Sequence, residues 1–115
     1  LLGVTFKGNT QDMRDSSSIK LIPYLSKRGA KIKYYDPTGY KKEFRNLKNV
    51  VFSNSIQESI KDSDLVIIHT EWNDFKSINF KNIVKGKKLI IYDMRNIYSP
   101  PKIKAQGFKY FSVGR

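Results

Sequence analysis

The sequence predicts a doubly wound, Rossmann-like α/β domain, a parallel sheet of five to six strands with helices on both faces. Short aliphatic runs without strict polar–apolar alternation recur along the chain, which is typical of strands buried on both faces. Segments with helical spacing or turn residues separate these runs, as in repeated strand–helix units. Residues 1–115 fit one such domain, and no linker, internal repeat or low-complexity tract divides them.

The first predicted strand is Leu1–Thr5, and a polar turn separates it from a helix. Ser16 or Ser17 is the expected N-cap, because its hydroxyl accepts a hydrogen bond from a free amide of the first turn. Apolar residues at every third position then mark one helix face, and a basic last turn ends at Gly29. Pro23 removes one hydrogen bond of this helix and should kink it.

The remaining elements follow from the same kinds of pattern. Runs of aliphatic and aromatic residues bounded by turn residues predict further strands. These strands are Lys31–Tyr35, Val50–Phe52, Leu65–Ile68, Leu89–Tyr92 and Lys109–Ser112. Ser55–Lys61 has two isoleucines four residues apart, which predicts a two-turn helix. A last helix begins at Pro100-Pro101 and ends near Gly107.

Polar residues follow three of the predicted strands. In doubly wound sheets, ligands bind beyond the carboxyl ends of the strands, near the point where the strand order reverses. With the common order 3-2-1-4-5-6, the first and fourth strands flank that crevice. The segments that leave the first, fourth and fifth strands are Phe6–Thr10, His69–Trp72 and Asp93–Asn96. We therefore expect these three segments to share one edge of the sheet.

This edge carries groups suited to a planar, anionic ligand. Lys7 offers a compact ammonium group for a phosphate, and Arg95 offers a planar fork for phosphate or sugar oxygens. Phe6 and Trp72 are placed to lie against a base or a sugar face. The alternative is that both cations are solvated loop residues. The turn after the first strand lacks the G-x-G-x-x-G spacing, so we expect no dinucleotide bound here in the Rossmann manner.

Other candidate residues favour a binding role over catalysis. On spacing alone, Arg14 pairs locally with Asp12 rather than reaching outward to a ligand or a partner domain. His69 is more typical of a histidine at a strand end than of a base, because no paired carboxylate orients it. Asp62, Asp64, Glu71 and Asp74 form an acidic stretch that we expect at the surface. The residues alone indicate no catalytic group and no metal site.

Composition limits the function classes further. Lys and Arg number 22 against 10 Asp and Glu, a net charge of +12 that suggests nucleic acid as a ligand. The basic residues are spread along the chain, so a non-catalytic nucleotide- or nucleic-acid-binding module is only the alternative function. The absence of cysteine excludes disulfides and a thiol nucleophile within this chain. Apolar runs are far shorter than the ~20 residues that span a bilayer, and we expect a cytoplasmic protein.

Long motifs resemble the nucleotide-sugar dehydrogenases of the UDP-glucose/GDP-mannose dehydrogenase family. Residues 3–16 match the pattern G-x-x-F-K-x-x-T-x-D-x-R-x-S, which opens the C-terminal UDP-binding domain of that family. Further matches are Gly29-Ala30, Tyr35–Pro37, Thr70–Trp72, Asp93 with Arg95–Tyr98, Gly107–Tyr110 and Gly114-Arg115. The resemblance extends over essentially the whole chain and is strongest to the bacterial UDP-glucose 6-dehydrogenase branch.

The resemblance implies a part of an enzyme that oxidises the sugar C6 hydroxyl of UDP-glucose to a carboxylate in two NAD-dependent steps. UDP-N-acetylmannosamine and GDP-mannose are the alternative substrates within the family. The resemblance also implies that Phe6, Lys7 and Arg95 contact the UDP-sugar. Arg14 is implied to reach the NAD pyrophosphate, which replaces its local role. Met94 departs from the family pattern, because many members have glycine there.

The same resemblance implies partners outside this chain. An N-terminal domain holds most of the NAD, a catalytic cysteine forms a covalent thiohemiacetal, and the intact enzyme is expected to be a homo-oligomer. This chain contains neither a cysteine nor a dinucleotide fingerprint. We therefore expect the chain alone to be inactive as a dehydrogenase, and we expect no membrane partner.

Overall fold

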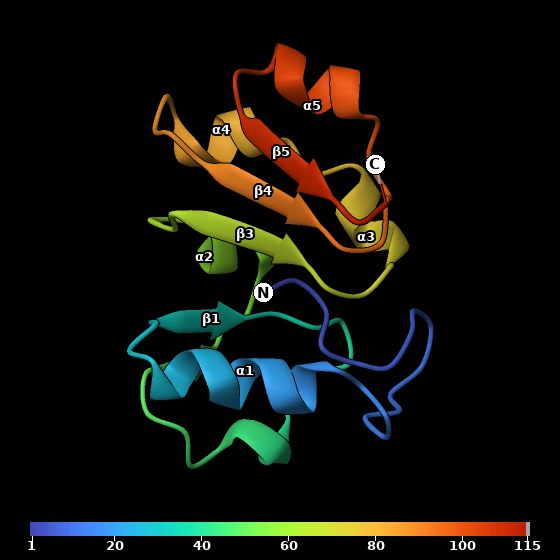
Figure 1. Cartoon of the computed structure of the whole chain (residues 1–115), viewed down its shortest axis with the longest axis vertical. Helices are drawn as coiled ribbons and strands as arrows, with labels where there is room; N and C mark the ends of the chain where they lie inside the picture. Colours follow the sequence, from blue (N-terminus) through green and yellow to red (C-terminus); the bar gives the residue numbers. More distant parts are fainter. Residues whose placement is uncertain (115) are drawn as a thin grey trace.

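The computed structural model describes residues 1–114, which form an α/β fold of parallel strands and short helices (Figure 1). The strands are β1 (Ile32–Tyr34), β2 (Val50–Phe52), β3 (Leu65–Ile68), β4 (Ile90–Asp93) and β5 (Lys109–Ser112). The helices are α1 (Ser18–Lys27), the 3₁₀ turn η1 (Lys42–Phe44), α2 (Ile56–Ile60), α3 (Asn73–Lys76), α4 (Phe80–Val84) and α5 (Pro100–Ala105). Arg115, the last residue of the matched closing motif, lies outside the described residues.

The described strands form two small sheets rather than the single sheet of five to six strands that the sequence predicts. β1 pairs with β2, and β3, β4 and β5 pair in that order. The predicted first strand, Leu1–Thr5, is reduced to isolated bridges at Leu2, which pairs with Tyr35 after β1 and with Ile68 of β3. Across the molecule the order is therefore β2, β1, Leu2, β3, β4 and β5.

Two features shorten the predicted first strand. Gly3 has a φ of +81°, which lies outside the strand region, and a Cβ there would lie 2.5 Å from the Cβ of Thr70. The next two amides, Val4 and Thr5, donate to the Asp36 carboxylate at 2.8 and 3.3 Å instead of to a neighbouring strand. The strand prediction is wrong beyond the second residue, because glycine geometry and a distant carboxylate redirect the main chain.

The start of α1 agrees in part with the prediction that Ser16 or Ser17 caps the helix. Ser17 occupies the N-cap position, but its side chain makes no capping hydrogen bond to the helix. Its hydroxyl lies 2.8 Å from Nε2 of His69 instead. Ser16 accepts the amide N–H of Ser18 at 3.3 Å and donates to the carbonyl of Val4 at 2.6 Å. The serines thus fasten the helix to the N-terminal segment and to the end of β3.

Two apolar cores form, one for each sheet. The smaller core joins α1 and η1 to β1 through Ile22, Tyr34 and Phe44. The larger core joins α2, α4 and α5 to β3–β5. Among the described residues, fourteen buried residues form the larger core and six form the smaller one. The short helices α3 and α4, which the sequence analysis did not predict, contribute Phe75 and Phe80 to it. No helix within residues 1–114 has the length and apolar character that crossing a membrane requires.

Helices cover both faces of β1 but one face of β3–β5. α1 lies on one side of β1, and on the other side Lys33 donates from Nζ to the carbonyl of Glu58 in α2 at 2.9 Å. In Figure 1, α2 and α4 lie behind β3 and β4 and α1 lies in front of β1. On the front of β3–β5, Tyr92 and Phe111 are exposed. The prediction of helices on both faces is therefore wrong for this sheet, because the crossovers between its strands all pack on the same side.

Candidate functional site

The three polar segments predicted to share an edge meet there, and Arg95 joins them. Its Nε donates to the carbonyl oxygen of His69 at 2.8 Å, and its Nη2 donates to that of Phe6 at 3.2 Å. The main-chain N–H of Arg95 donates to the carboxylate of Asp93 at 3.1 Å, which fixes the turn after β4. The guanidinium of Arg95, which the sequence analysis assigned to a ligand, thus already donates hydrogen bonds to two loop carbonyls. We call this region the strand-end edge.

Glu71 closes the turn that carries Lys7. One carboxylate oxygen accepts the N–H of Gly8 at 3.0 Å, and the other lies 3.3 Å from Nε of Arg95. The main chain at Gly8 lies so close to Glu71 that a Cβ on Gly8 would be 1.9 Å from the carbonyl oxygen of Glu71. Burial acts to raise the pKa of Glu71, but main-chain N–H groups and Arg95 outweigh it and hold that pKa below its ordinary value. The sequence placed Glu71 in a surface stretch and missed this role.

His69 is buried, at 1% exposure, in a hydrogen-bonded chain that crosses the edge. Thr70 donates its hydroxyl hydrogen to the carbonyl of Thr5 at 2.9 Å. Nδ1 of His69, 3.0 Å from that hydroxyl oxygen, is therefore the donor, and Nε2 accepts from the Ser17 hydroxyl at 2.8 Å. Burial, followed by the charge of Arg95, lowers the pKa of His69 from 6.5 to about 4. The neutral imidazole ties α1 to β3, in line with the predicted strand-end role.

The aromatic residues of the edge separate into one exposed and one buried side chain. Phe6 is 42% exposed, next to the exposed Lys7. Trp72 is 8% exposed and belongs to the larger core. The prediction that Trp72 lies against a ligand is wrong, because α3 begins directly after it and the chain turns its ring inward. Its Nε1 has no hydrogen-bond partner within the described part of the chain.

Arg14 pairs with Asp12 as the spacing predicts. Nε and Nη2 of Arg14 lie 3.1 and 3.2 Å from the two carboxylate oxygens, and the side chain of Arg14 is 89% exposed. The hydrogen bonds from Arg14, those of its side chain first, lower the pKa of Asp12. The main chain of Asp12 accepts the N–H of Phe6 at 2.8 Å, so this pair belongs to the same loop as Phe6 and Lys7.

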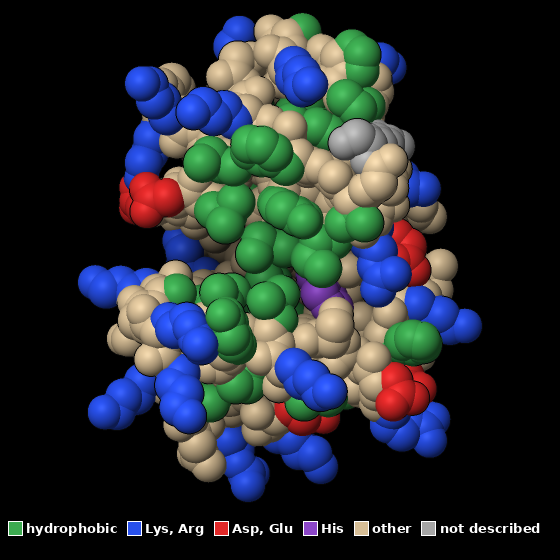
Figure 2. All heavy atoms as spheres, viewed as in Figure 1, with side chains coloured by type: hydrophobic (Ala, Val, Ile, Leu, Met, Phe, Trp, Pro, Cys, Tyr) green, Lys and Arg blue, Asp and Glu red, His purple; other side chains and the backbone are tan. Residues whose placement is uncertain are grey.

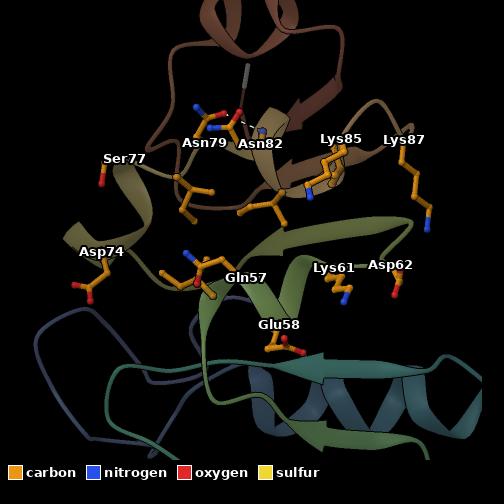
Figure 3. Close-up of a pocket in the computed structure, with 14 residues that line it drawn as sticks. Gln57, Glu58, Lys61, Asp62, Asp74, Ser77, Asn79, Asn82, Lys85 and Lys87 are labelled. Carbon is orange, nitrogen blue, oxygen red and sulfur yellow. Dashed lines mark hydrogen bonds between the residues drawn. The ribbon is translucent and has the colours of Figure 1, made fainter.

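A cleft of about 800 Å³ lies apart from the strand-end edge, between α2 and the α3–α4 segment (Figure 3). None of the predicted site residues lines it. Ile56 and Ile83 contribute apolar surface, while Glu58, Lys61 and Asp74 bring charges of both signs from different elements. These charges do not converge on one point, so the strand-end edge is the candidate site.

Comparisons with known proteins identify the family of this chain. The family described as "UDP-glucose/GDP-mannose dehydrogenase family, UDP binding domain" matches residues 1–100. The chain belongs to this family. The UDP-glucose 6-dehydrogenase of Rhizobium meliloti (strain 1021) is 35% identical over 116 residues, which cover 100% of this chain and 26% of that protein. The family resemblance that the motifs indicated is confirmed.

Solved structures of dehydrogenases contain a part with the same fold as this chain. The NDP-N-acetyl-D-galactosaminuronic acid dehydrogenase from Methanosarcina mazei Go1 matches with a TM-score of 0.82 at 24% identity, covering 99% of this chain and 24% of that one, a likeness of fold. The UDP-D-ManNAc dehydrogenase from Pyrococcus horikoshii matches with a TM-score of 0.76 at 29% identity, with 99% and 24% covered. The chain therefore spans about a quarter of the length of these relatives.

Proposed function

We propose that this chain binds the UDP part of a UDP-sugar within an NAD-dependent dehydrogenase that oxidises UDP-glucose to UDP-glucuronate. The observation that carries the proposal is the meeting of Phe6, Lys7 and Arg95 at the strand-end edge. Membership of the family and the likeness to a UDP-glucose 6-dehydrogenase support it. The likeness to a UDP-D-ManNAc dehydrogenase keeps that sugar as the alternative substrate.

The geometry gives each residue a role in this proposal. The exposed ammonium group of Lys7 neutralises a phosphate, and the turn that carries it is held by Glu71. The ring of Phe6 packs on the planar part of the ligand. Arg95 bonds the diphosphate or the sugar, and the arriving anion competes with Glu71 for its guanidinium. Glu71 keeps the N–H of Gly8, so the turn stays closed when the ligand binds.

The residues of this chain do not build an NAD site by themselves. The segment after Leu2 has no G-x-G-x-x-G spacing, and Arg14 is the residue we assign to the cofactor. Its exposed guanidinium would face the NAD pyrophosphate, with the remaining contacts supplied by an N-terminal domain. The chain has no cysteine, so thiol chemistry also comes from outside it. We propose this domain and further copies of the enzyme as the partners.

Isothermal titration of the chain with UDP tests the site. Lys7→Ala and Arg95→Ala should each weaken UDP binding by about 1.5–3 kcal/mol, the range for hydrogen bonds to charged groups. Lys104→Ala in α5 and Arg45→Ala after η1 remove the same charges elsewhere and should leave the affinity unchanged. If the control variants lose as much UDP affinity, the effect comes from the net charge of the chain and not from a site at Lys7 and Arg95.

The nucleic-acid alternative has its own outcome in this experiment. Binding to a random DNA duplex that weakens steeply with salt, together with no binding of UDP at millimolar concentration, would replace the proposed function. The expected result is the reverse, with UDP bound and the duplex bound weakly or not at all.

A further inference from the structure

One face of the β3–β4–β5 sheet is apolar, and no element within residues 1–114 covers it. Because the strands pair in parallel and in register, alternate residues line up across this face. One row contains Ile67, Tyr92 and Phe111, with Tyr92 40% and Phe111 54% exposed. The set Leu65, Ile67, Ile90, Tyr92, Phe111 and Val113 defines what we call the open face. In Figure 2 apolar side chains gather over these strands.

The open face differs from an ordinary exposed surface. Parallel sheets are normally covered on both sides, and their strands are apolar on both sides for that reason. The opposite face of the same strands, with Val66, Ile91 and Tyr110, packs into the larger core. β1 has α1 on one side and α2 on the other. An apolar face of this kind, rimmed by polar residues, marks a surface where another protein segment binds.

The charge of the chain argues against a second copy as the occupant. The net charge of +12 repels an identical chain. Lys109 stands on the open face itself, in register with Ile90, and Lys88 precedes β4 and is exposed. A face with lysines at its border instead matches a segment that carries carboxylates beside an apolar stripe.

We propose, on the basis of the function proposed above, that the open face docks the part of the dehydrogenase that lies outside this chain. This chain matches 26% of the Rhizobium meliloti enzyme, so about three-quarters of such an enzyme remains to cover it. The docking segment has an apolar stripe over Tyr92 and Phe111 and acidic residues toward Lys88 and Lys109. It extends the layer that α1 begins on the same side of the molecule (Figure 1).

Co-expression tests the docking surface. This chain, tagged, is produced with the part of the Rhizobium meliloti UDP-glucose 6-dehydrogenase that it does not match, and the complex is recovered by the tag. The wild-type chain should retain that part. The double variant Tyr92→Lys with Phe111→Lys places two charges on the open face and should reduce recovery by about tenfold or more. Val51→Lys, at a site 60% exposed on β2, is the matched control and should recover as much as wild type.

Each other outcome overturns the proposal. These are no recovery by the wild-type chain, undiminished recovery by the double variant, or an equal loss with Val51→Lys. Light scattering on the chain alone should give the monomer mass of 13.4 kDa, and a dimer that the double variant dissociates would assign the open face to a second copy. Titration with UDP distinguishes failure of the proposed function, because the double variant leaves Lys7 and Arg95 intact and should bind UDP as wild type does.

Discussion

The two sheets of this molecule are stabilised in different ways. Among residues 1–114, the β1–β2 side has the longest helix, α1, but a core of only six buried residues. The β3–β5 side has short helices around fourteen buried residues, many of them aromatic. Where the two sides meet, polar contacts add to apolar packing: Leu2 bridges both sides and is buried in the larger core, while the Asp36 carboxylate and the His69 chain bind neighbouring segments. The candidate site lies at this junction, so its geometry depends on polar contacts as well as on the larger core.

The largest effect is expected in the larger core. Phe80 is fully buried, and its ring lies 5.7 Å from that of Tyr98 and 6.2 Å from that of Phe108. Phe80→Ala should lower the free energy of unfolding by about 3–5 kcal/mol. Phe44→Ala is the matched change in the smaller core, and it should fall at the lower end of that range because a three-residue 3₁₀ turn can move inward to fill the space.

Urea unfolding followed by fluorescence of the single tryptophan and by far-UV circular dichroism measures both variants. Trp72 reports on the β3–β5 side, and circular dichroism reports on both sides. If Phe44→Ala lowers the free energy of unfolding more than Phe80→Ala does, the smaller core contributes more at this position than the larger core, contrary to the prediction.

The next effect is a dependence of stability on pH that comes from the junction. The pKa of His69 is about 4 in the folded chain and about 6.5 when unfolded. Between pH 6.5 and 4, His69 binds a proton in the unfolded chain but stays neutral in the folded chain. Protonation of His69 therefore lowers the free energy of unfolding by about 3 kcal/mol as the pH drops from 6.5 to 4.

Nuclear magnetic resonance of the imidazole provides the measurement, since the chain has one histidine. His69→Gln should remove this contribution and leave that of the Leu1 amine, whose pKa burial lowers from 8.0 to about 5. A folded-state titration of the imidazole near pH 6.5 would contradict the buried, neutral ring.

Two buried aspartates allow the junction to be compared with the larger core. Asp36 accepts hydrogen bonds from the amides of Val4 and Thr5, and Asp93 accepts from the amide of Tyr98 and the hydroxyl of Tyr110. Replacing either by asparagine should lower the free energy of unfolding by about 1–3 kcal/mol, because a buried partner loses its acceptor.

Hydrogen exchange then separates the two aspartates. Asp36→Asn should speed exchange at the amides of Leu2 and His69, which join the sheets, while Asp93→Asn should leave them protected. The same pattern in both variants would mean that the two sides open as one unit.

The parts of the fold that local patterns specify were predicted closely. β3 and β5 have the predicted bounds, Leu65–Ile68 and Lys109–Ser112, because each is an apolar run closed by turn residues. α4 was missed, although its Phe80 and Val84 have the same spacing of four residues that predicted α2. The first strand failed for a tertiary reason, the carboxylate of Asp36, which lies more than thirty positions from the amides it binds.

The site was predictable to the extent that topology determines it. The rule that strand ends gather at one edge brought the segments of Phe6 and Arg95 together correctly. The supporting contacts were not predictable, because Glu71 bonds the amide of Gly8 63 positions away and His69 bonds Ser17 52 positions away. Single residue types at such separations give no local signal.

The smallest effect on stability is expected at Arg14, on the loop of the β1–β2 side. Its pair with Asp12 is exposed to solvent, and exposed ion pairs contribute little to stability. Arg14→Ala should therefore leave the thermal unfolding midpoint of the chain unchanged. In an intact dehydrogenase containing this domain, the same variant should raise the KM for NAD without changing that for the UDP-sugar, because the proposed contact of Arg14 with the pyrophosphate is lost. Lys20→Ala in α1 removes a nearby charge and should change neither. If Arg14→Ala instead lowers the midpoint and leaves the KM for NAD unchanged, Arg14 orders its own loop, as its spacing from Asp12 first indicated.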